Sequence, residues 1–439
     1  MINKEKTHFD ISFFLVLLCI SLIVAFVQNI VFYSIYAAVL LGVIYHKAKF
    51  SFFTALSFIL VFSLYQTMIQ SLTRNARGMI KNAIVRIPLY ENEHGLCTIS
   101  FLMTLVFFIL FTDLIKNELK LYQVNIRMTN LTAILLIFTS IVLTILMFPS
   151  FPDFKLHLAI RRSQSLLGNY GWVLTALVLA GLTVDMAYKM KWLWGCYALI
   201  AFWIFGHAER VECLGFIIYL VLKIINRREL TTGKKNINDN LSLGNKHTFW
   251  KKTVIFSGLF VVFLLLIVLG IYRDVDSGNR TKFTLVGIIN NLLVQATAGD
   301  VIYVFDCAVD MWKKGNLVHG ITYIDWILNM IPGASAEYQV AYYIKNWYFT
   351  MGGALFFTEP MMNFGMIGVF ISNIIFCYFY SFIVKKQTML RAMIFLPMVI
   401  EIFRTTWYGR NGWQLTSFIE IPLIYLGITL VTNKFEVTI

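Results

Sequence analysis

Long apolar runs separated by short polar segments follow one another along the whole chain. A helix that crosses a hydrocarbon core of roughly 30 Å needs about 20 mostly apolar residues, and by that measure the pattern predicts about 12 transmembrane helices. The second, eighth and eleventh of these are short. The predicted spans cover residues 11–29, 31–46, 50–70, 98–115, 131–148, 170–188, 192–207, 211–225, 253–272, 360–384, 392–403 and 416–432.

No Gly/Ser-rich linker or internal repeat divides these spans, so we expect a single integral-membrane domain over residues 1–439. The first apolar run is too long for the core of a signal peptide, which predicts a retained anchor. The longest segment between spans, residues 273–359, is predicted to be a large, partly helical outer loop, and loops of this length are usually functional. Within it, residues 283–297 and 301–312 have amphipathic patterns and are expected to lie at the outer interface as short helices.

Composition narrows the class of protein. Of the 439 residues, 59% are hydrophobic and 14% are charged, whereas an average soluble domain has roughly 45–50% apolar and about 25% charged residues. This composition excludes soluble, disordered and fibrous classes. The six cysteines include no Cys-x-x-Cys pair, which indicates neither a disulfide framework nor a zinc site. No P-loop or His-Glu-x-x-His motif is present, so ATP-driven transport and zinc proteolysis lose support.

The positions of the basic residues predict the orientation. The net charge is +14, which in a soluble protein would suggest nucleic-acid binding. In a polytopic chain, the placement of Lys and Arg in short loops matters more. The basic clusters all fall on one side of the predicted spans, so we expect both termini in the cytoplasm and no nucleic-acid partner.

Arginine is distributed against this trend, because most arginines, but few lysines, fall on the predicted outer side. The planar guanidinium suits bidentate phosphate binding, so this surplus indicates an anionic ligand at the outer face. Contacts with lipid headgroups are the alternative explanation. The outer arginines are Arg74, Arg77, Arg86, Arg161, Arg162, Arg210, Arg273, Arg280, Arg404 and Arg410.

One cluster with candidate chemistry lies where the chain enters the span at 360–384. Glu359 comes directly before Pro360, which suits the first position of a helix, so a carboxylate is predicted at the outer mouth of a span. An ionisable group there is costly unless it is paired or used. The alternative is a charge that complements the helix macrodipole. Gly365 and Gly368 are expected to allow close helix packing.

A second cluster lies in the last outer loop. Glu401 and Arg404 are three positions apart and would pair on one face of a helix. Arg410 lies in a Gly-Arg-Asn-Gly turn between Tyr408 and Trp413. The guanidinium would bind phosphate and the aromatic faces would stack on sugar rings. An ordinary turn within an interfacial aromatic belt is the alternative.

Two further groups of polar residues are weaker signals. Residues 207–212, His-Ala-Glu-Arg-Val-Glu, are expected to form a polar plug at the outer end of a helical hairpin, with His207 in a structural role. In the large outer loop, Asp306 and Asp310 are four positions apart and are expected to share a solvated helix face.

Taken together, these features resemble the Wzy-type O-antigen polymerases, or oligosaccharide repeat-unit polymerases. The resemblance rests on the bulky, low-charge polytopic layout, on the large outer loop in the C-terminal half, and on residues 358–368, Thr-Glu-Pro-Met-Met-Asn-Phe-Gly-Met-Ile-Gly. Members often show an acidic residue, an Asn-Phe-Gly and a second Gly at this spacing. The layout covers the whole chain and the motif only this stretch. The Arg-x10-Gly motif of some polymerases and ligases is absent.

The resemblance implies a multi-pass glycosyltransferase of the bacterial inner membrane, acting at its outer face in lipopolysaccharide biosynthesis. It would transfer the growing glycan from undecaprenyl pyrophosphate to a new lipid-linked repeat unit, without a metal or cofactor. The expected catalytic residues are Glu359, as base, and Arg410, which would stabilise the leaving pyrophosphate. Besides the lipid-linked oligosaccharide, the implied partners are membrane lipids, a chain-length regulator and a flippase. The expected substrate-binding residues are Arg161, Arg162, Arg210, Arg273, Arg280, Asn363, Arg404, Tyr408 and Trp413.

Two other functions stay open. A flippase for the same lipid-linked unit would also fit about 12 spans with both ends inside, although transporters usually carry charged or broken-helix sites near the midplane. The related O-antigen ligases are the second alternative.

Overall fold

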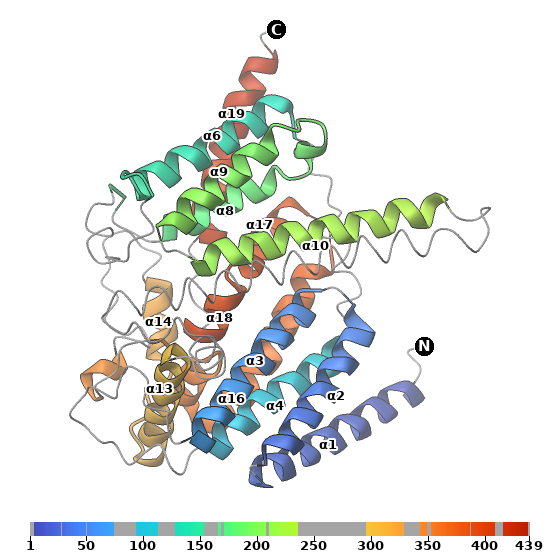
Figure 1. Ribbon diagram of the computed structural model, residues 1–439, viewed down its shortest axis with the longest axis vertical. Helices are drawn as coiled ribbons and strands as arrows, with labels where there is room; N and C mark the ends of the chain where they lie inside the picture. The colour runs from blue at the N-terminus through green and yellow to red at the C-terminus, as the bar shows by residue number, and fades with distance from the viewer. Residues whose placement is uncertain are drawn as a thin grey trace, which may run out of the picture. The chain divides into compact units, whose positions relative to one another are not determined.

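The computed structural model is helical, and the residues that it describes form no β-strand, which confirms the predicted all-α class (Figure 1). The described residues are 4–27, 29–49, 51–73, 94–112, 128–152, 166–167, 171–207, 210–235, 296–328, 343–348, 353–386, 388–408 and 416–437. The predicted span at 253–272 and the predicted interfacial helix at 283–297 therefore lie outside them. The second predicted interfacial helix, residues 301–312, is confirmed as a helix.

The helix bounds follow the predicted apolar runs in most places. The α-helices are α1 Lys4–Val27, α2 Ile30–Ala48, α3 Phe52–Thr73, α4 His94–Phe111, α6 Asn130–Met147, α8 Gly171–Leu182, α9 Leu193–Gly206, α10 Arg210–Lys235, α13 Ala296–Lys313, α14 Ile321–Leu328, α16 Thr358–Val384, α17 Met389–Ile400, α18 Ile402–Tyr408 and α19 Ile421–Val437. The shorter elements are the 3₁₀ turns η4 Met186–Tyr188 and η6 Ile344–Asn346 and the π-helical turn η7 Thr416–Glu420.

Polar side chains set the starts of several helices. The Asn29 carboxamide oxygen accepts a hydrogen bond from the backbone N–H of Val31 at 2.9 Å at the start of α2. Thr129 caps α6 through its hydroxyl, which accepts from the backbone of Thr132 at 3.1 Å. Such caps satisfy backbone donors that have no partner within the helix. They explain why these apolar runs become helical at the observed residues.

Three of the described helices, α2, α6 and α16, are long and apolar enough to cross a membrane, and shorter apolar helices accompany them. The full set of about 12 spans stays a prediction. The helices α8 and α17 have 12 residues each. At 1.5 Å per residue, each helix is about 18 Å long. The eleventh predicted span, residues 392–403, is interrupted at Glu401, which ends α17 before α18 begins.

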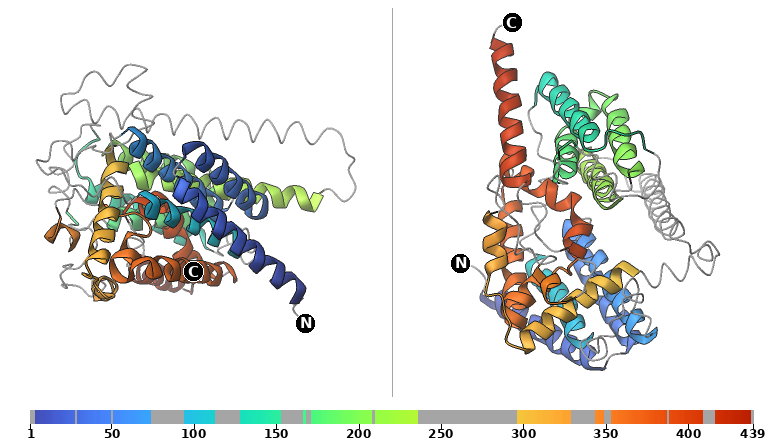
Figure 2. Two further views of the ribbon diagram at one scale, coloured as in Figure 1. Left: turned by 90° about the horizontal axis from the view of Figure 1, so that it is seen from below. Right: turned by 90° about the vertical axis from the view of Figure 1, so that its left-hand side faces the viewer.

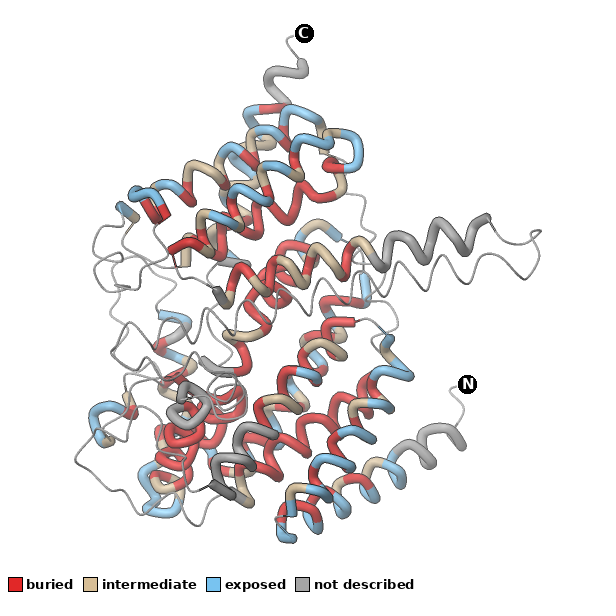
Figure 3. The backbone as a smooth tube through the Cα atoms, in the orientation of Figure 1, coloured by how far each residue is buried: buried red, intermediate tan, exposed pale blue. Residues whose placement is uncertain are grey.

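Many large apolar residues are exposed on the described helices, and Figure 3 colours the exposed positions along them pale blue. On α16, Ile367, Ile371 and Ile375 form a stripe at four-residue spacing, with exposed fractions of 71%, 47% and 62%. The opposite face of the same helix is buried. A large apolar surface on a helix bundle is compatible with embedding in a membrane. The choice of the bacterial inner membrane and the cytoplasmic placement of the termini stay predictions.

The chain contacts divide the protein into two compact units, each described here by itself, and the single domain over residues 1–439 stays a prediction. The first unit comprises Met1–Glu118, Val294–Gln387 and Ile402–Leu415. Within it, α4 contacts α1, α2, α3 and α16. The core where α3, α4 and α16 meet is aromatic, with the Phe53 ring edge-to-face against Phe108 at 4.5 Å and Tyr380 at 4.4 Å. Such pairs add about 0.5–1.5 kcal/mol each beyond area burial.

The second unit comprises Leu119–Leu293, Thr388–Glu401 and Thr416–Ile439. The backbones of α10 and α17 approach closely within it. A Cβ atom added at Gly215 would lie 1.7 Å from the backbone oxygen of Ile400, so only glycine fits at this point.

We predict that Gly215→Ala destabilises the second unit by roughly 1–3 kcal/mol or more, because the added methyl group forces α10 away from the α17 backbone. The matched control is Gly195→Ala in α9, where a Cβ meets nothing within 4 Å. That change should be neutral or stabilising, since Ala is the better helix former. Thermal unfolding of the purified protein in detergent measures both, and equal melting temperatures would contradict the proposed crossing.

Candidate functional site

The helix α16 is sharply bent at Gly365, whose φ of 63° and ψ of −153° are not helical. A positive φ is open to glycine at little cost. A Cβ atom here would also lie 2.5 Å from the indole nitrogen of Trp312, so α13 packs directly against the bend. Figure 2 shows α13 and α14 (yellow to orange) beside the start of α16 (orange). The short segment 358–364 is therefore set apart from the long span that follows it.

The second glycine of the motif completes the bend. A Cβ atom at Gly368 would lie 2.3 Å from the backbone oxygen of Pro360. The first turn of α16 thus comes close to the backbone of the long span. Both glycines serve close backbone approach, as the sequence suggests, but the contact is within α16 and with Trp312 rather than along a smooth face between two spans.

Asn363 joins α14 to the bent start of α16. Its side-chain oxygen accepts from the backbone N–H of Gly320 at 2.7 Å. Its amide nitrogen donates to the Thr322 hydroxyl at 2.7 Å and to the Glu359 carbonyl at 2.9 Å. Both amide hydrogens are used, and the side chain is fully buried. Asn363 is therefore a positioning residue in this structure, and its predicted contact with substrate stays a prediction.

Glu359 lies in the first turn of α16 and is 3% exposed, between the fully buried Phe357 and Met361. The neighbouring ring of Phe357 is enclosed edge-to-face by Phe101 and Phe305, at 4.8 and 5.1 Å. A buried carboxylate is costly unless hydrogen bonds, ion pairs or a ligand compensate it. The macrodipole at the start of the helix supplies part of this compensation, because its positive end favours a negative charge.

Thr358 adds a second buried polar group at the same place. Its side chain has no exposed surface, and among the described residues its hydroxyl has no hydrogen-bond partner. Buried hydroxyl groups are nearly always satisfied, so an orphan of this kind needs an explanation. A polar ligand that reaches the start of α16 would supply the missing partner.

The structure brings α18 to this position. The backbone N–H of Phe356 donates to the carbonyl of Thr406 at 3.0 Å, which ties α18 to the residues that enter α16. Arg404 is half-buried on α18, and Tyr408 is its last residue. The two sequence clusters, around Glu359 and around Arg404, therefore meet within one unit. The predicted helical pairing of Glu401 with Arg404 lacks a continuous helix, because Glu401 ends α17.

The two aspartates of α13 differ from the sequence expectation. The expected solvated face is wrong for Asp306, which is fully buried. Asp310 accepts hydrogen bonds from Lys314 at 2.6 Å and from the Tyr348 hydroxyl at 2.5 Å. Burial acts to raise the pKa of the Asp310 carboxyl, but these hydrogen bonds and the charges of Lys313 and Lys314 outweigh it and lower the pKa below 3.8. Asp310 thus stays ionised and holds the η6 segment against α13.

The other predicted site residues are placed in part or not at all. Arg210 is the first residue of α10, in the second unit. Six further predicted residues lie outside the described part of the chain. They are Arg161, Arg162, Arg273, Arg280, Arg410 and Trp413.

His207 behaves as the structural residue that was predicted. It is 1% exposed, and its ring stacks on Phe148 with centroids 4.7 Å apart. The two ring nitrogens lie 2.7 Å from the Trp203 carbonyl oxygen and 3.0 Å from that of Ser150. These contacts join the end of α9 to the chain after α6.

Sequence reasoning missed an ion pair in the second unit. The Lys223 ammonium of α10 lies 2.6 Å from the Asp185 carboxylate, and the two side chains are only 3% and 11% exposed. The two residues are far apart in the sequence and belong to different apolar runs, so no local pattern pairs them. Among the described residues, no group of three or more His, Cys, Asp or Glu side chains is arranged to hold a metal ion.

We predict that Gly365→Ala disrupts the candidate site more than Gly315→Ala. Both glycines have positive φ, at 63° and 74°, but only Gly365 faces a neighbour within 4 Å. The control, Gly315→Ala, should therefore lose only the roughly 1 kcal/mol of stability that backbone strain costs. Gly365→Ala should also displace Trp312. Limited proteolysis of the loop before α16 and thermal unfolding should both report the difference. Identical behaviour of the two variants would argue against the bend.

No family model, curated protein or solved structure matches this chain. The resemblance to the O-antigen polymerases therefore rests on the membrane layout and on residues 358–368 alone.

Proposed function

We propose that this protein is a surface-polysaccharide polymerase that extends a glycan on undecaprenyl pyrophosphate at the outer face of the bacterial inner membrane. The observation that carries the proposal is the environment of Glu359. A buried carboxylate lies at the bent start of an apolar, membrane-capable helix, beside an orphan hydroxyl and beside the helix that carries Arg404. A purely structural span has no need for this set of polar groups.

The reaction suits those groups. A hydroxyl of the non-reducing sugar of the new unit attacks the anomeric carbon of the growing chain. The new glycosidic C–O bond forms as the bond to the pyrophosphate oxygen breaks, and undecaprenyl pyrophosphate leaves with the electron pair. Glu359 accepts the hydroxyl proton as general base. Arginines at the outer face stabilise the charge that develops on the pyrophosphate, with Arg410 as the first candidate and Arg404 as a second.

The packing around Glu359 supports precise positioning. Asn363 ties the first turn of α16 to Gly320 and Thr322, at the start of α14, by two hydrogen bonds, and its third bond, to the Glu359 carbonyl, lies within the turn. The missing side chain of Gly365 lets Trp312 pack against the end of this turn. A catalytic group held by packed neighbours loses little freedom when the substrate binds. The first turn of α16, which carries Glu359, is thus held in place by its contacts with α13 and α14.

One observation favours the transporter alternative. The buried ion pair of Asp185 and Lys223 is the type of charged group that transporters carry among their helices. The polymerase remains the better proposal because the same pair also has a structural explanation, since it ties the turn after α8 to α10.

The first test is Glu359→Gln, read on the lipopolysaccharide ladder of a strain that lacks the wild-type protein. A positioned general base contributes about 10²–10⁴-fold, so the ladder should collapse to core plus one repeat unit at normal protein abundance. Glu359→Asp should be partly active. A matched control is Glu420→Gln in the second unit, where the new amide oxygen can still accept the hydrogen bond from Thr175.

A full ladder from the Gln variant would end the catalytic assignment of Glu359. A ladder without any repeat unit, with units retained at the cytoplasmic face, would instead indicate a flippase. If the lipopolysaccharide core carries no repeat unit but lipid-linked units are present at the outer face, the result would indicate a ligase.

The second test is Arg410→Lys, which keeps the charge but removes the planar fork of donors. If Arg410 binds pyrophosphate bidentately, Lys should lose much of the activity and Ala nearly all of it. The ladder and the protein abundance are measured together. Near-wild-type ladders from both variants would show that Arg410 is an interfacial anchor and does not bind the pyrophosphate.

A further inference from the structure

The short helix α14 is amphipathic in the opposite sense to a surface helix of a water-soluble protein. Its polar side chains are turned inward, since Thr322 and Asp325 are only 1% and 5% exposed. Its outward face carries Ile324, Ile327 and Leu328, which are 57%, 57% and 47% exposed. Water favours the reverse arrangement, with apolar residues inside and polar residues outside, whereas hydrocarbon favours the one observed.

The exposed face of α14 adjoins the apolar surface of α16. The Tyr323 ring of α14 stacks on the Phe364 ring of α16, with centroids 6.5 Å apart. Phe364 is itself 46% exposed, and Ile367 three residues later begins the exposed isoleucine stripe of α16. Because α16 is long and apolar enough to cross a membrane, an apolar surface that runs from it onto α14 indicates that one hydrophobic phase covers both.

A polar turn precedes α14 along the chain. Residues 313–316, Lys-Lys-Gly-Asn, are all exposed at the end of α13 and just after it. The helix α14 has eight residues, so it is about 12 Å long and far too short to cross a bilayer. A short helix with one apolar face suits the boundary between headgroups and acyl chains, with its polar neighbours toward water.

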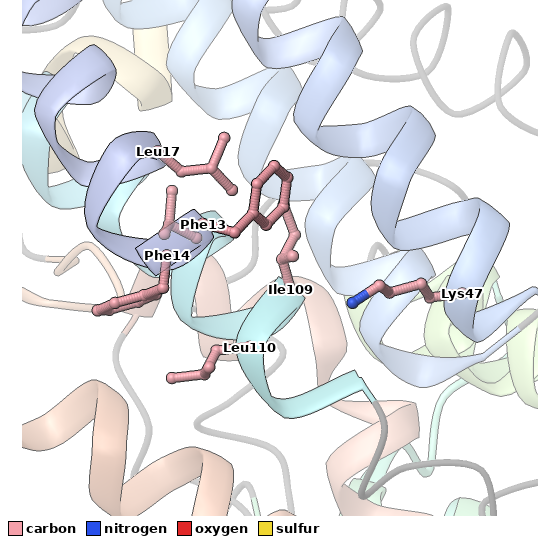
Figure 4. A pocket seen from close by; sticks show the side chains of 7 residues that line it. Phe13, Phe14, Leu17, Lys47, Ile109 and Leu110 are labelled. Atoms are coloured by element: carbon pink, nitrogen blue, oxygen red, sulfur yellow. The ribbon is translucent and has the colours of Figure 1, made fainter. Parts of the chain in front are cut away.

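Other parts of the first unit do not offer such a surface. The helix α13 of the same outer loop is buried at every position from Val301 to Val309. The pocket where α1, α2 and α4 meet, lined by Phe13, Leu17 and Ile109 among others, leaves room for a water-sized group but not for an acyl chain (Figure 4). The outward face of α14 is therefore the part of the described outer loop that fits a lipid surface.

We propose that α14 is a membrane-interface helix, whose face of Ile324, Ile327 and Leu328 is embedded among the acyl chains of the bilayer around α16. On the predicted orientation this is the outer leaflet. The proposal does not rest on the polymerase reaction. Because Asn363 bonds to Thr322, an embedded α14 would hold the bent start of α16 at the depth of the membrane boundary.

The test is spin labelling of the full-length protein in nanodiscs of phosphatidylcholine and phosphatidylglycerol. Labels are attached to Ile324→Cys, Ile327→Cys or the exposed control Asn316→Cys. The background carries Cys19→Ala and Cys196→Ala, which removes the two cysteines that are not buried. The ratio of collisions with oxygen, which concentrates in hydrocarbon, to collisions with a water-soluble nickel chelate should be several-fold higher at positions 324 and 327 than at 316.

Two results of this measurement would overturn the proposal. Free access of the nickel chelate to the labels at 324 and 327, as at 316, would show that the face of α14 lies in water. Few collisions with either reagent would show that protein covers the face, for example a second copy of this chain.

A charge substitution gives an independent readout. Ile324→Asp should lower the melting temperature in the same nanodiscs by several degrees, because a carboxylate is costly among acyl chains. Asn316→Asp should leave the melting temperature unchanged, since this residue lies in the exposed polar turn. An Ile324→Asp variant that melts with the wild type would contradict an embedded α14, because an aspartate is tolerated at this position only in water.

Discussion

The backbone bend at Gly365 is the constraint on which the candidate site depends. A helix that continued straight from Thr358 to Val384 would carry its first turn along the axis of the span that follows. The positive φ of Gly365 instead redirects the first turn, and the absence of a side chain lets Trp312 pack against the turning point. The redirected turn carries Asn363, which bonds to Gly320 and Thr322 at the start of α14. The chain just before this turn is held by α18, through the bond from Phe356 to Thr406.

Buried polar groups are the second feature that distinguishes this protein from a simple bundle of apolar helices. Glu359 and Asp306 are carboxylates with little or no exposed surface in the first unit, and Asp185 with Lys223 forms a buried ion pair in the second. Burying such groups costs free energy that packing alone does not return. Polar groups of this kind are retained where they hold a geometry or act on a ligand, and Asn363 shows the first of these roles directly.

The helical class and the approximate positions of most helices could be predicted from the sequence. A long apolar segment in a membrane is stable as a helix, because a helix gives its backbone N–H and C=O groups hydrogen-bond partners within the segment. For the same reason the runs that start at Ile30, Asn130 and Thr358 became helices that are long and apolar enough to cross a membrane. The prediction failed at Glu401, where the predicted span 392–403 is divided between α17 and α18, because mean hydropathy contains no information about a local break in the backbone.

The sequence by itself determined that the chain is a helical, apolar protein and that Glu359, Asn363, Gly365 and Gly368 form one local motif, since their spacing within a single helix start is enough to group them. Only the tertiary structure decided what those residues contact. The bond from Phe356 to Thr406, the packing of Trp312 on Gly365 and the pairing of Asp185 with Lys223 all join residues that are far apart in the chain. Hydrophobic periodicity states which face of a helix is buried, but the partner that buries it depends on the three-dimensional packing of all the helices.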